Sequence, residues 1–362
     1  MNTNIVQSLE ECVVKAAVWY GAKDVRVEEV EVPNILDKQV KVQVAYTGIC
    51  GSDLHEYIEG PVFIPADEPN PFSGKEAPLT MGHEFSGVVT EVGNDVTTIS
   101  VGDRVSIYPT LANEKKAEEI DIYDGYNFIG LAQDGGMAEF CVLPETAVYK
   151  LPESMTLKEG ALVEPTAVAV QAIKEGSVKF GDKVAIFGAG PIGCLVAAAA
   201  KAAGAIQIIV CDLSEERLEK ALEMGATHVI NSGKEDAVAV IRELTQGGAD
   251  VSFEVAGVEV TVKQAIDATK ARGTMVIVSI FAKPISWHPM QLINSGVKIT
   301  STIAYSRTTY QQTIQAIANG QLVVKPIITK TIALEDVVTE GFETLVSDKT
   351  QAKILIDIHS ED

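Results

Sequence analysis

The stretch VAIFGAGPIG, residues 184–193, decides the fold of this chain. It ends an apolar, strand-like run and matches the pattern G-x-G-x-x-G, and an Ala-rich helical pattern follows it to residue 203. In a strand–turn–helix of this kind the glycines allow a tight turn, a close backbone approach to a pyrophosphate and close helix packing. The N-terminus of the helix offers free N–H groups to phosphates. The residues expected to bind a dinucleotide here are Gly188, Gly190, Pro191, Ile192 and Gly193.

The chain around this stretch alternates short apolar strands with helical patterns. The strands expected here are residues 183–188, 206–212, 228–231, 250–256 and 274–280. Each is almost continuously apolar, as is required of a sheet that is covered on both faces. Strands that alternate with helices predict a doubly wound parallel sheet, so we expect an α/β domain.

Asp212 ends the second of these strands, 19 residues beyond Gly193. An acidic residue at this place hydrogen-bonds the ribose hydroxyls of a bound dinucleotide, and its charge repels a 2′-phosphate, which favours NAD over NADP. Arg217 is the nearest cation and is a further candidate for the coenzyme site, although the exposed face of the next helix is the simpler place for it. The alternative is a glycine-cornered turn in another doubly wound fold.

The remainder of the chain has a different character. Residues 14–148 are rich in β-branched residues bounded by Gly and Pro, which predicts a mostly β domain. The last part predicts helices around 310–318 and 337–345 and a strand over 352–358. A chain of 362 residues is too long for one hydrophobic core, so about two domains are expected.

Composition excludes several classes of protein. The hydrophobic fraction of 46% and the charged fraction of 22% are those of a globular protein. A formal charge of −21 repels phosphate backbones and anionic membranes, so no nucleic-acid or membrane partner is expected. The five cysteines form no C-x-x-C pair, and residues 1–12 resemble an added leader without secretory features. These features predict reduced thiols and a cytoplasmic protein.

Three separate short motifs carry residues that could bind a metal. Cys50 lies in GICGSDLHEY (48–57), His83 in GHE (82–84), and Glu164 directly before Pro165. Each alone has a structural explanation, but a thiolate, an imidazole and a carboxylate together suit zinc, with one coordination position left open for catalysis. Asp53 could orient a ligating imidazole from behind.

These motifs resemble the zinc-containing medium-chain alcohol and polyol dehydrogenases, and within that family the butanediol dehydrogenase branch. The resemblance extends from about residue 14 to the end of the chain. It is carried by GICGSDLHEY, GPVFIP (60–65), APLTMGHEFSG (77–87), DGGMAEF (134–140), ALVEPTAVA (161–169), VAIFGAGPIG, GATHVI (225–230) and KPISWHP (283–289). The resemblance implies a zinc- and NAD-dependent oxidoreductase that acts on a small vicinal diol or hydroxyketone, such as 2,3-butanediol and acetoin.

The resemblance also implies roles for individual residues. Cys50, His83 and Glu164 match the zinc ligands, and Glu84 adjoins the metal and could ligate it in an alternative state. Ser52 and His55 match the proton relay, in which an imidazole suits the last step because it changes charge near neutral pH. The implied fold is a GroES-like catalytic domain of residues 1–164 and 308–362 that contains an inserted Rossmann domain of residues 165–307. A homodimer or homotetramer is implied, with the strand VKITSTIA (297–304) as its candidate edge.

One departure from the family concerns a second, structural zinc. Many relatives hold it with four cysteines in a lobe that corresponds here to residues 108–130, and this stretch contains no cysteine. We therefore expect one zinc per subunit and no structural zinc, with the Glu and Lys residues of the lobe solvated.

Two other functions remain open at this point. A sorbitol, xylitol or threonine dehydrogenase would share the zinc and coenzyme residues. A non-catalytic, NAD-binding interaction protein could use the same fold. The second alternative is disfavoured because such a protein is expected to lose residues that carry chemistry. All of them are present here: Cys50, Ser52, His55, His83 and Glu164.

Overall fold

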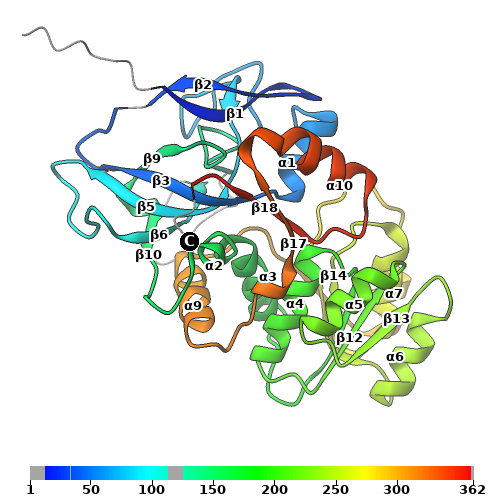
Figure 1. Ribbon diagram of the computed structural model, residues 1–362. Coiled ribbons are helices and arrows are strands. Elements are labelled where there is room, and N and C mark those ends of the chain that lie inside the picture. The colour runs from blue at the N-terminus through cyan, green and yellow to red at the C-terminus, as the bar shows by residue number, and fades with distance from the viewer. Residues whose placement is uncertain (1–12, 33, 113–124, 360–362) are drawn as a thin grey trace, which may run out of the picture.

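The computed structural model describes residues 13–32, 34–112 and 125–359, and the chain forms two layered halves joined side by side (Figure 1). The expected leader at 1–12 lies outside the described residues. The Glu and Lys residues of the expected lobe at 108–130 also lie outside them.

The α/β half contains a six-stranded sheet in which every neighbouring pair is parallel. Its strand order is β13-β12-β11-β14-β15-β16, which is the order of a Rossmann sheet. The chain adds β12 and β13 on one side of β11 and then adds β14, β15 and β16 on the other side. The strands are β11 (Lys183–Phe187), β12 (Gln207–Asp212), β13 (His228–Asn231), β14 (Ala249–Glu254), β15 (Thr269–Ile277) and β16 (Lys298–Ser301). The predicted doubly wound sheet is therefore confirmed.

Helices follow these strands and cover the sheet (Figure 1). They are α4 (Pro191–Ala202), α5 (Glu215–Glu223), α6 (Ala237–Thr245), α7 (Glu259–Ala268) and α8 (Met290–Ser295). Side chains begin two of them: Ser214 accepts a hydrogen bond from the N–H of Arg217, and Asp236 accepts one from Ala239. Caps of this kind contribute about 1 kcal/mol each.

The β-rich half is built from both ends of the chain. Its larger sheet has the order β10-β6-β5-β3-β18-β17, with β9 also paired to β3. These strands are β3 (Gln39–Gly48), β5 (Glu84–Val92), β6 (Arg104–Ile107), β9 (Phe140–Pro144), β10 (Val148–Lys150), β17 (Ile328–Ala333) and β18 (Lys353–Asp357). Figure 1 shows the C-terminal β18 beside β3, which is why the N-terminal segments and the end of the chain share one domain.

Smaller elements complete this half. A three-stranded sheet holds β1 (Val13–Gly21), β2 (Asp24–Glu31) and β4 (Leu79–Thr80), and a hairpin pairs β7 (Thr110–Ala112) with β8 (Tyr126–Phe128). The helices are α1 (Gly51–Glu59), α2 (Leu157–Ala161), α3 (Val163–Glu175), α9 (Arg307–Ala318) and α10 (Glu343–Ser347). Short 3₁₀ turns cover Glu145–Ala147, Lys325–Ile327 and Leu334–Asp336.

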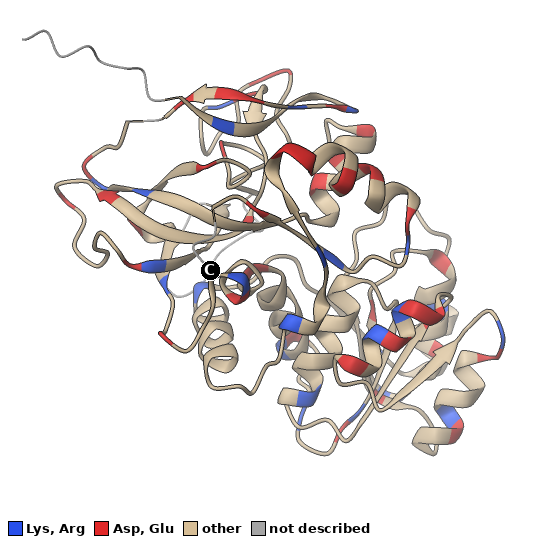
Figure 2. Cartoon of the chain, in the orientation of Figure 1, with Lys and Arg blue, Asp and Glu red and all other residues tan. Residues whose placement is uncertain are grey.

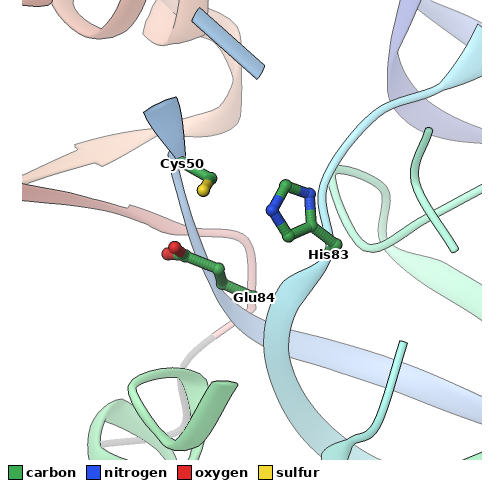
Figure 3. Close-up of side chains that lie close together, drawn as sticks. All are labelled: Cys50, His83 and Glu84. Carbon is green, nitrogen blue, oxygen red and sulfur yellow. The ribbon is translucent and has the colours of Figure 1, made fainter. Parts of the chain in front are cut away.

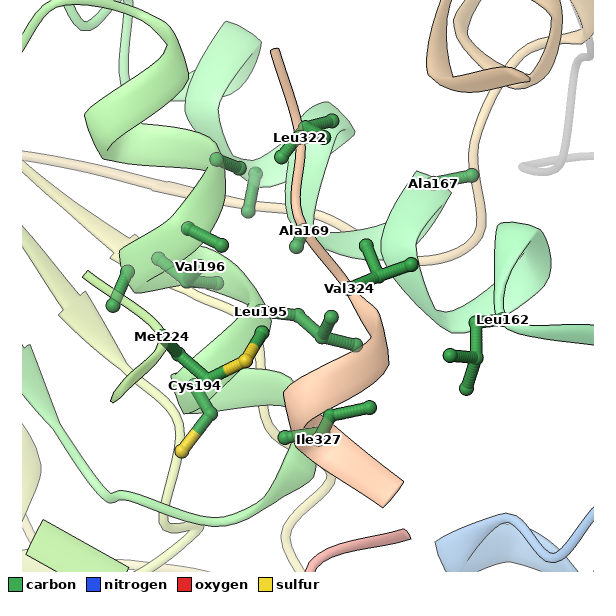
Figure 4. Packing of buried hydrophobic residues seen from close by; sticks show 14 of the residues in the cluster. Leu162, Ala167, Ala169, Cys194, Leu195, Val196, Met224, Leu322, Val324 and Ile327 are labelled. Atoms are coloured by element: carbon green, nitrogen blue, oxygen red, sulfur yellow. The ribbon is translucent and has the colours of Figure 1, made fainter. Parts of the chain in front are cut away.

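Helices α3 and α9 connect the two halves. Lys174 on α3 donates to Thr309 Oγ1 at 2.8 Å and to Gln312 Oε1 at 2.6 Å, both on α9. The largest buried cluster extends from α3 and α4 to the returning segment before β17, so the Rossmann helices and the C-terminal part share a core (Figure 4). The expected domain boundaries fall at these two helices, and their exact positions stay a prediction.

Three local expectations differ from the structure. The segment after Gly48 continues as helix α1, within the region that the sequence predicted to be mostly β. Strand β15 begins at Thr269, five residues before the expected start, because it follows α7 without a loop. The helix expected over 337–345 is π-helical over Val337–Phe342 and becomes α-helical only in α10.

Acidic positions are distributed over both halves, with Lys and Arg among them (Figure 2). The net charge of −21 is thus spread over the surface of both halves. Within the described residues, no helix is long and apolar enough to cross a membrane.

Candidate active site between the two domains

A compact group of three potential metal ligands lies where β3 and β5 meet. Cys50 follows the end of β3 and begins α1, and His83 and Glu84 stand at the start of β5. Antiparallel pairing of Gly48 with Glu84 brings these chain segments together. The ligand atoms of the three side chains lie within 4.8 Å of one another, and the side chains point toward a common point (Figure 3).

His83 is held from two sides. Its Nε2 lies 3.2 Å from Ser52 Oγ, and its Nδ1 faces Asp53 Oδ1 at 3.4 Å without an aligned hydrogen bond. The other carboxylate oxygen of Asp53 accepts the N–H of Cys50 at 2.9 Å, so Asp53 ties both residues together. Asp53 therefore lies behind the imidazole as expected, which is the arrangement that orients a metal-ligating histidine.

Electrostatics show that this group of side chains suits a cation. Burial by itself lowers the pKa of His83, but the neighbouring charges of Asp53 and Cys50 outweigh it and raise that pKa well above its ordinary value. A pocket that stabilises an added proton so strongly is negatively polarised. Thiolate, imidazole and carboxylate are ligands that suit zinc, so the residues present fit the ion.

Two buried carboxylates adjoin this group and have different partners. Lys353 Nζ lies 2.7 Å from both oxygens of Glu84. Glu164, on α3, accepts a hydrogen bond from Tyr305 Oη at 2.6 Å. Burial raises the pKa of Glu164 to about 7, although the charge of His83 opposes this shift. Among the described residues, Glu84 belongs to the 4.8 Å group and Glu164 does not, but both line the same cavity.

That cavity has a volume of about 320 Å³ and lies between the two halves. One wall contains Cys50, Ser52, His55, His83, Glu84 and Glu164. The opposite wall contains residues that follow the carboxyl ends of β11, β14, β15 and β16: Ile192, Val255, Ala256, Val278, Ser279, Ile280, Thr302, Ile303 and Ala304. Ligands of open α/β sheets bind at this edge, so a dinucleotide's reactive end would meet the metal group here.

The glycine-rich turn has the backbone that its motif requires. Gly188 has φ +115°, and an added methyl group at Gly193 would overlap the carbonyl oxygen of Gly188. Gly190 begins α4 with Pro191 in its first turn, and a methyl group at Gly190 would meet open space. The open N-terminus of α4 is a cradle in which phosphates can approach the backbone.

Asp212 lies against this turn. One carboxylate oxygen accepts the N–H of Ala189 at 2.7 Å, and the other accepts those of Leu213 and Ser214. Arg217 is turned away toward the C-terminal part, where its Nε donates to the carbonyl oxygen of Lys349 at 2.5 Å. The carboxylate is thus placed at the turn, and the guanidinium is engaged elsewhere.

His55 lies at the mouth of the cavity. Its side chain is 44% exposed, and Nδ1 lies 3.5 Å from Glu59 one helical turn further on. Ser52 lies one turn of α1 before it and reaches the metal group through His83. Helix α1 therefore connects the buried end of the site with solvent.

Sequence reasoning missed three residues of this site. Lys353 and Tyr305 restrain the two carboxylates, and Glu56 accepts the N–H groups of Val62, Phe63 and Ile64, which fixes the GPVFIP segment beside the cavity. A lysine inside the apolar run AKILIDI was the one available signal. Tyr305 belongs to none of the quoted motifs, and Glu56 lies within GICGSDLHEY, where it was given no role.

Comparisons with known proteins agree with this geometry. Residues 36–153 match the alcohol dehydrogenase GroES-like domain, and residues 191–319 match the zinc-binding dehydrogenase family. The (R,R)-butanediol dehydrogenase of Bacillus subtilis is 44% identical over 95% of this chain and 99% of its own length. Sorbitol dehydrogenase 1 of Saccharomyces cerevisiae is 35% identical over 89% of this chain and 91% of its own length. The crystal structure of 2R,3R-butanediol dehydrogenase from Bacillus subtilis, 44% identical, matches with a TM-score of 0.91 over 96% of this chain and 100% of its own.

A Rossmann domain that faces a metal group on a GroES-like domain defines the class of zinc-containing dehydrogenases. The chain belongs to the zinc-binding dehydrogenase family. It is an oxidoreductase that uses zinc and a nicotinamide cofactor on small-molecule substrates. The resemblance and the enzyme class predicted from the sequence are thereby confirmed.

Proposed function

We propose that this enzyme moves a hydride between NAD(H) and a small vicinal diol or hydroxyketone, with 2,3-butanediol and acetoin as the substrate pair. One observation carries the proposal: a single cavity is lined by the metal group on one side and by the carboxyl ends of the Rossmann strands on the other. The 44% identity to a butanediol dehydrogenase over nearly the whole chain supports the choice of substrate.

The metal site consists of Cys50, His83 and Glu164, with Asp53 behind the imidazole. When bound, zinc supplies Lewis-acid polarisation of the substrate oxygen while the nicotinamide exchanges the hydride. We place one zinc in each subunit and no structural zinc, because residues 108–130 contain no cysteine. Metal analysis of the purified enzyme checks this ratio.

Ser52 and His55 are the proton-handling residues. The hydroxyl of Ser52 lines the cavity next to His83 and can accept the proton that leaves the substrate. His55 lines the same cavity and is in contact with solvent, so its imidazole can release a proton to water. Glu84 lines the same cavity but is paired with Lys353, and its place is beside the metal rather than in the proton path.

NAD is the coenzyme that the glycine-rich turn favours. The turn is formed by Gly188, Gly190, Pro191, Ile192 and Gly193. Asp212 places a negative charge beside it, which opposes the 2′-phosphate of NADP. Arg217 is engaged with Lys349 and does not compensate that charge at the turn, so we leave it outside the coenzyme contacts.

The substrate end of the cavity favours a short diol over a long polyol. Its walls include Phe63, Tyr126, Phe128 and Leu131, which offer apolar surface and one phenol. Methyl groups beside a vicinal diol suit such walls, whereas each additional hydroxyl of sorbitol would need a polar partner that they do not supply. Sorbitol remains the alternative substrate because of the 35% identity to a sorbitol dehydrogenase.

The test is an NAD-reduction assay with the three stereoisomers of 2,3-butanediol, sorbitol, xylitol and threonine. We expect the largest kcat/KM with a butanediol isomer, and at least about tenfold less with sorbitol, since one unmatched polar group costs that much or more. A larger kcat/KM with sorbitol or threonine would contradict the proposed substrate. NAD binding without turnover of any substrate would revive the non-catalytic alternative.

We further propose a homo-oligomer in the cytoplasm. Strand β16 lies at the end of the six-stranded sheet, and exposed apolar side chains of Met290 and Ile293 lie near it in sequence. A second copy could extend the sheet at this edge. Sedimentation analysis distinguishes dimer, tetramer and monomer, and cell fractionation checks the compartment.

A further inference from the structure

A buried carboxylate lies at the end of β14 and takes no part in the chemistry proposed above. Glu254 is the last residue of this strand, and its side chain is 0% exposed. Burying an anion is unfavourable unless other groups stabilise its charge. A neutral side chain would avoid this penalty, so a buried anion at this position needs an explanation.

Four donors hold the carboxylate, and all of them are neutral. One oxygen accepts the N–H of Ala256 at 2.9 Å, the N–H of Gly257 at 2.8 Å and the hydroxyl of Thr261 at 2.7 Å. The other oxygen accepts the hydroxyl of Ser279. Among the described residues, no cation forms an ion pair with Glu254. Neutral donors stabilise an ionised carboxylate without cancelling its charge.

These contacts place the charge directly behind the coenzyme wall, which is the set of cavity residues that follow β11, β14, β15 and β16. Ala256 and Ser279 belong to this wall and come from the loops after β14 and β15. A methyl group at Gly257 would lie 2.7 Å from the carbonyl oxygen of Ile280, so the two loops pack against each other. The carboxylate of Glu254 therefore lies behind both loops and contacts two residues that line the cavity.

The surroundings leave this charge without a counter-charge. Among the described residues that line the cavity, none on the coenzyme wall has a charged side chain. On the opposite wall, Lys353 offsets the charge of Glu84. Electrostatic interactions are stronger inside a protein cavity than in bulk water, because the effective dielectric constant is lower. The charge of Glu254 therefore acts on any ring that binds against this wall.

We propose that the carboxylate of Glu254 is a fixed negative charge that makes the coenzyme site bind oxidised nicotinamide in preference to reduced nicotinamide. This inference rests on the coenzyme site of the proposed function. The oxidised ring carries a positive charge and the reduced ring is neutral, so an anion behind the wall attracts only the oxidised ring. The same charge favours the departure of NADH once a diol has been oxidised.

The hydrogen bonds of Glu254 also join the two loops, and this structural role has to be separated from the effect of charge. NAD⁺ and NADH present the same atoms to the wall apart from the hydride. Loss of the loop structure would therefore weaken the binding of both forms alike. Loss of the charge alone would weaken the binding of NAD⁺ and leave that of NADH almost unchanged.

The affinities of NAD⁺ and NADH for the zinc-loaded enzyme test the proposal. Both dissociation constants are measured without substrate, by calorimetric titration for NAD⁺ and by fluorescence titration for NADH. Glu254→Gln removes the charge and keeps a carbonyl oxygen for the N–H groups of Ala256 and Gly257. We expect NAD⁺ affinity to fall about tenfold and NADH affinity to change less than about threefold.

Ser279→Ala is the matched variant with the opposite expectation, and it does not depend on the folding of Glu254→Gln. It keeps the carboxylate and removes the hydroxyl that donates to it from the cavity side. With one donor fewer, the charge acts more strongly on the cavity. The ratio of the NADH to the NAD⁺ dissociation constant is therefore expected to rise about threefold.

An unchanged ratio in Glu254→Gln, whether both affinities fall equally or neither falls, would overturn the proposal. A ratio that stays constant or decreases in Ser279→Ala would also overturn it. Failure of the underlying coenzyme site gives a different result, because the wild-type enzyme would then bind neither NAD⁺ nor NADH.

Discussion

The metal group and the glycine-rich turn face each other across one cavity but are assembled in opposite ways. The turn comes from ten consecutive residues, 184–193, and its geometry follows from local backbone requirements. The metal group draws Cys50, His83 and Glu84 from two separate segments of the chain, and Lys353 joins Glu84 from the last strand.

This difference has a physical consequence. A change in the turn should affect coenzyme binding and leave the metal in place, because the turn's hydrogen bonds among the described residues go to Cys211 and Asp212 on β12. A change in the metal group should remove chemistry and leave the dinucleotide cradle intact. The following variants test how independent the two regions are.

The largest expected effect is that of Cys50→Ala. Loss of the thiolate removes one of three zinc ligands, so we expect loss of zinc from the purified enzyme and a decrease in kcat of at least about 1000-fold. NAD affinity, measured by fluorescence titration, should change less than about threefold. Full activity without zinc would eliminate this metal site, and a parallel loss of NAD binding would show that the regions are coupled.

Gly193→Val should produce the reverse pattern. Its side chain would overlap the carbonyl oxygen of Gly188 and displace the turn. We expect NAD affinity to fall about 100-fold, equivalent to about 2.7 kcal/mol of binding free energy, while zinc content stays at the wild-type level. Calorimetric titration with NAD checks the expected loss of affinity, and metal analysis of the same sample checks the zinc content. Wild-type NAD affinity would remove the turn from the coenzyme site.

Glu164→Gln should alter the pH dependence of stability in the metal-free enzyme. Burial raises the pKa of Glu164 from 4.5 to about 7 in the folded protein, so the folded state binds this proton more tightly than the unfolded state. The contribution of Glu164 to the free energy of unfolding is therefore most favourable below pH 4.5 and is lost as the pH rises through 7.

Glutamine does not titrate, so the chelator-treated variant should exceed the wild type in unfolding free energy by about 2 kcal/mol at pH 8. The difference should shrink toward pH 5. Urea unfolding at both pH values measures it. A difference that is independent of pH would assign the effect to packing instead of ionisation.

The smallest expected effect is that of Asp212→Ala, which should reduce the preference for NAD over NADP about tenfold. Asp212→Asn is the matched control, because it removes the charge and keeps an oxygen that can accept the N–H of Ala189. The ratio of kcat/KM values for the two coenzymes measures the preference. An unchanged ratio in both variants would show that another group excludes the 2′-phosphate.

Most of the fold could be predicted from sequence because its signals are local. The alternation of apolar strands with helices specified the Rossmann sheet, and the ligand types at Cys50 and His83 indicated zinc. Helix α1 was missed because its nine residues, Gly51–Glu59, are too few for a helical period to be recognised directly after a strand-like run. Lys353 was missed because the only local sign of it, a lysine inside an apolar strand, does not say which distant carboxylate it pairs with.

By itself the sequence determined the turn at Gly188–Gly193, the order of strands and helices around it, and the set of ligand chemistries available to a metal. Those features depend on neighbours within a few residues. Only the tertiary structure decided that Lys353 meets Glu84 and that Tyr305 meets Glu164. The reason is that an ion pair or hydrogen bond between distant segments depends on how the sheets pack, and that packing is a property of the whole chain.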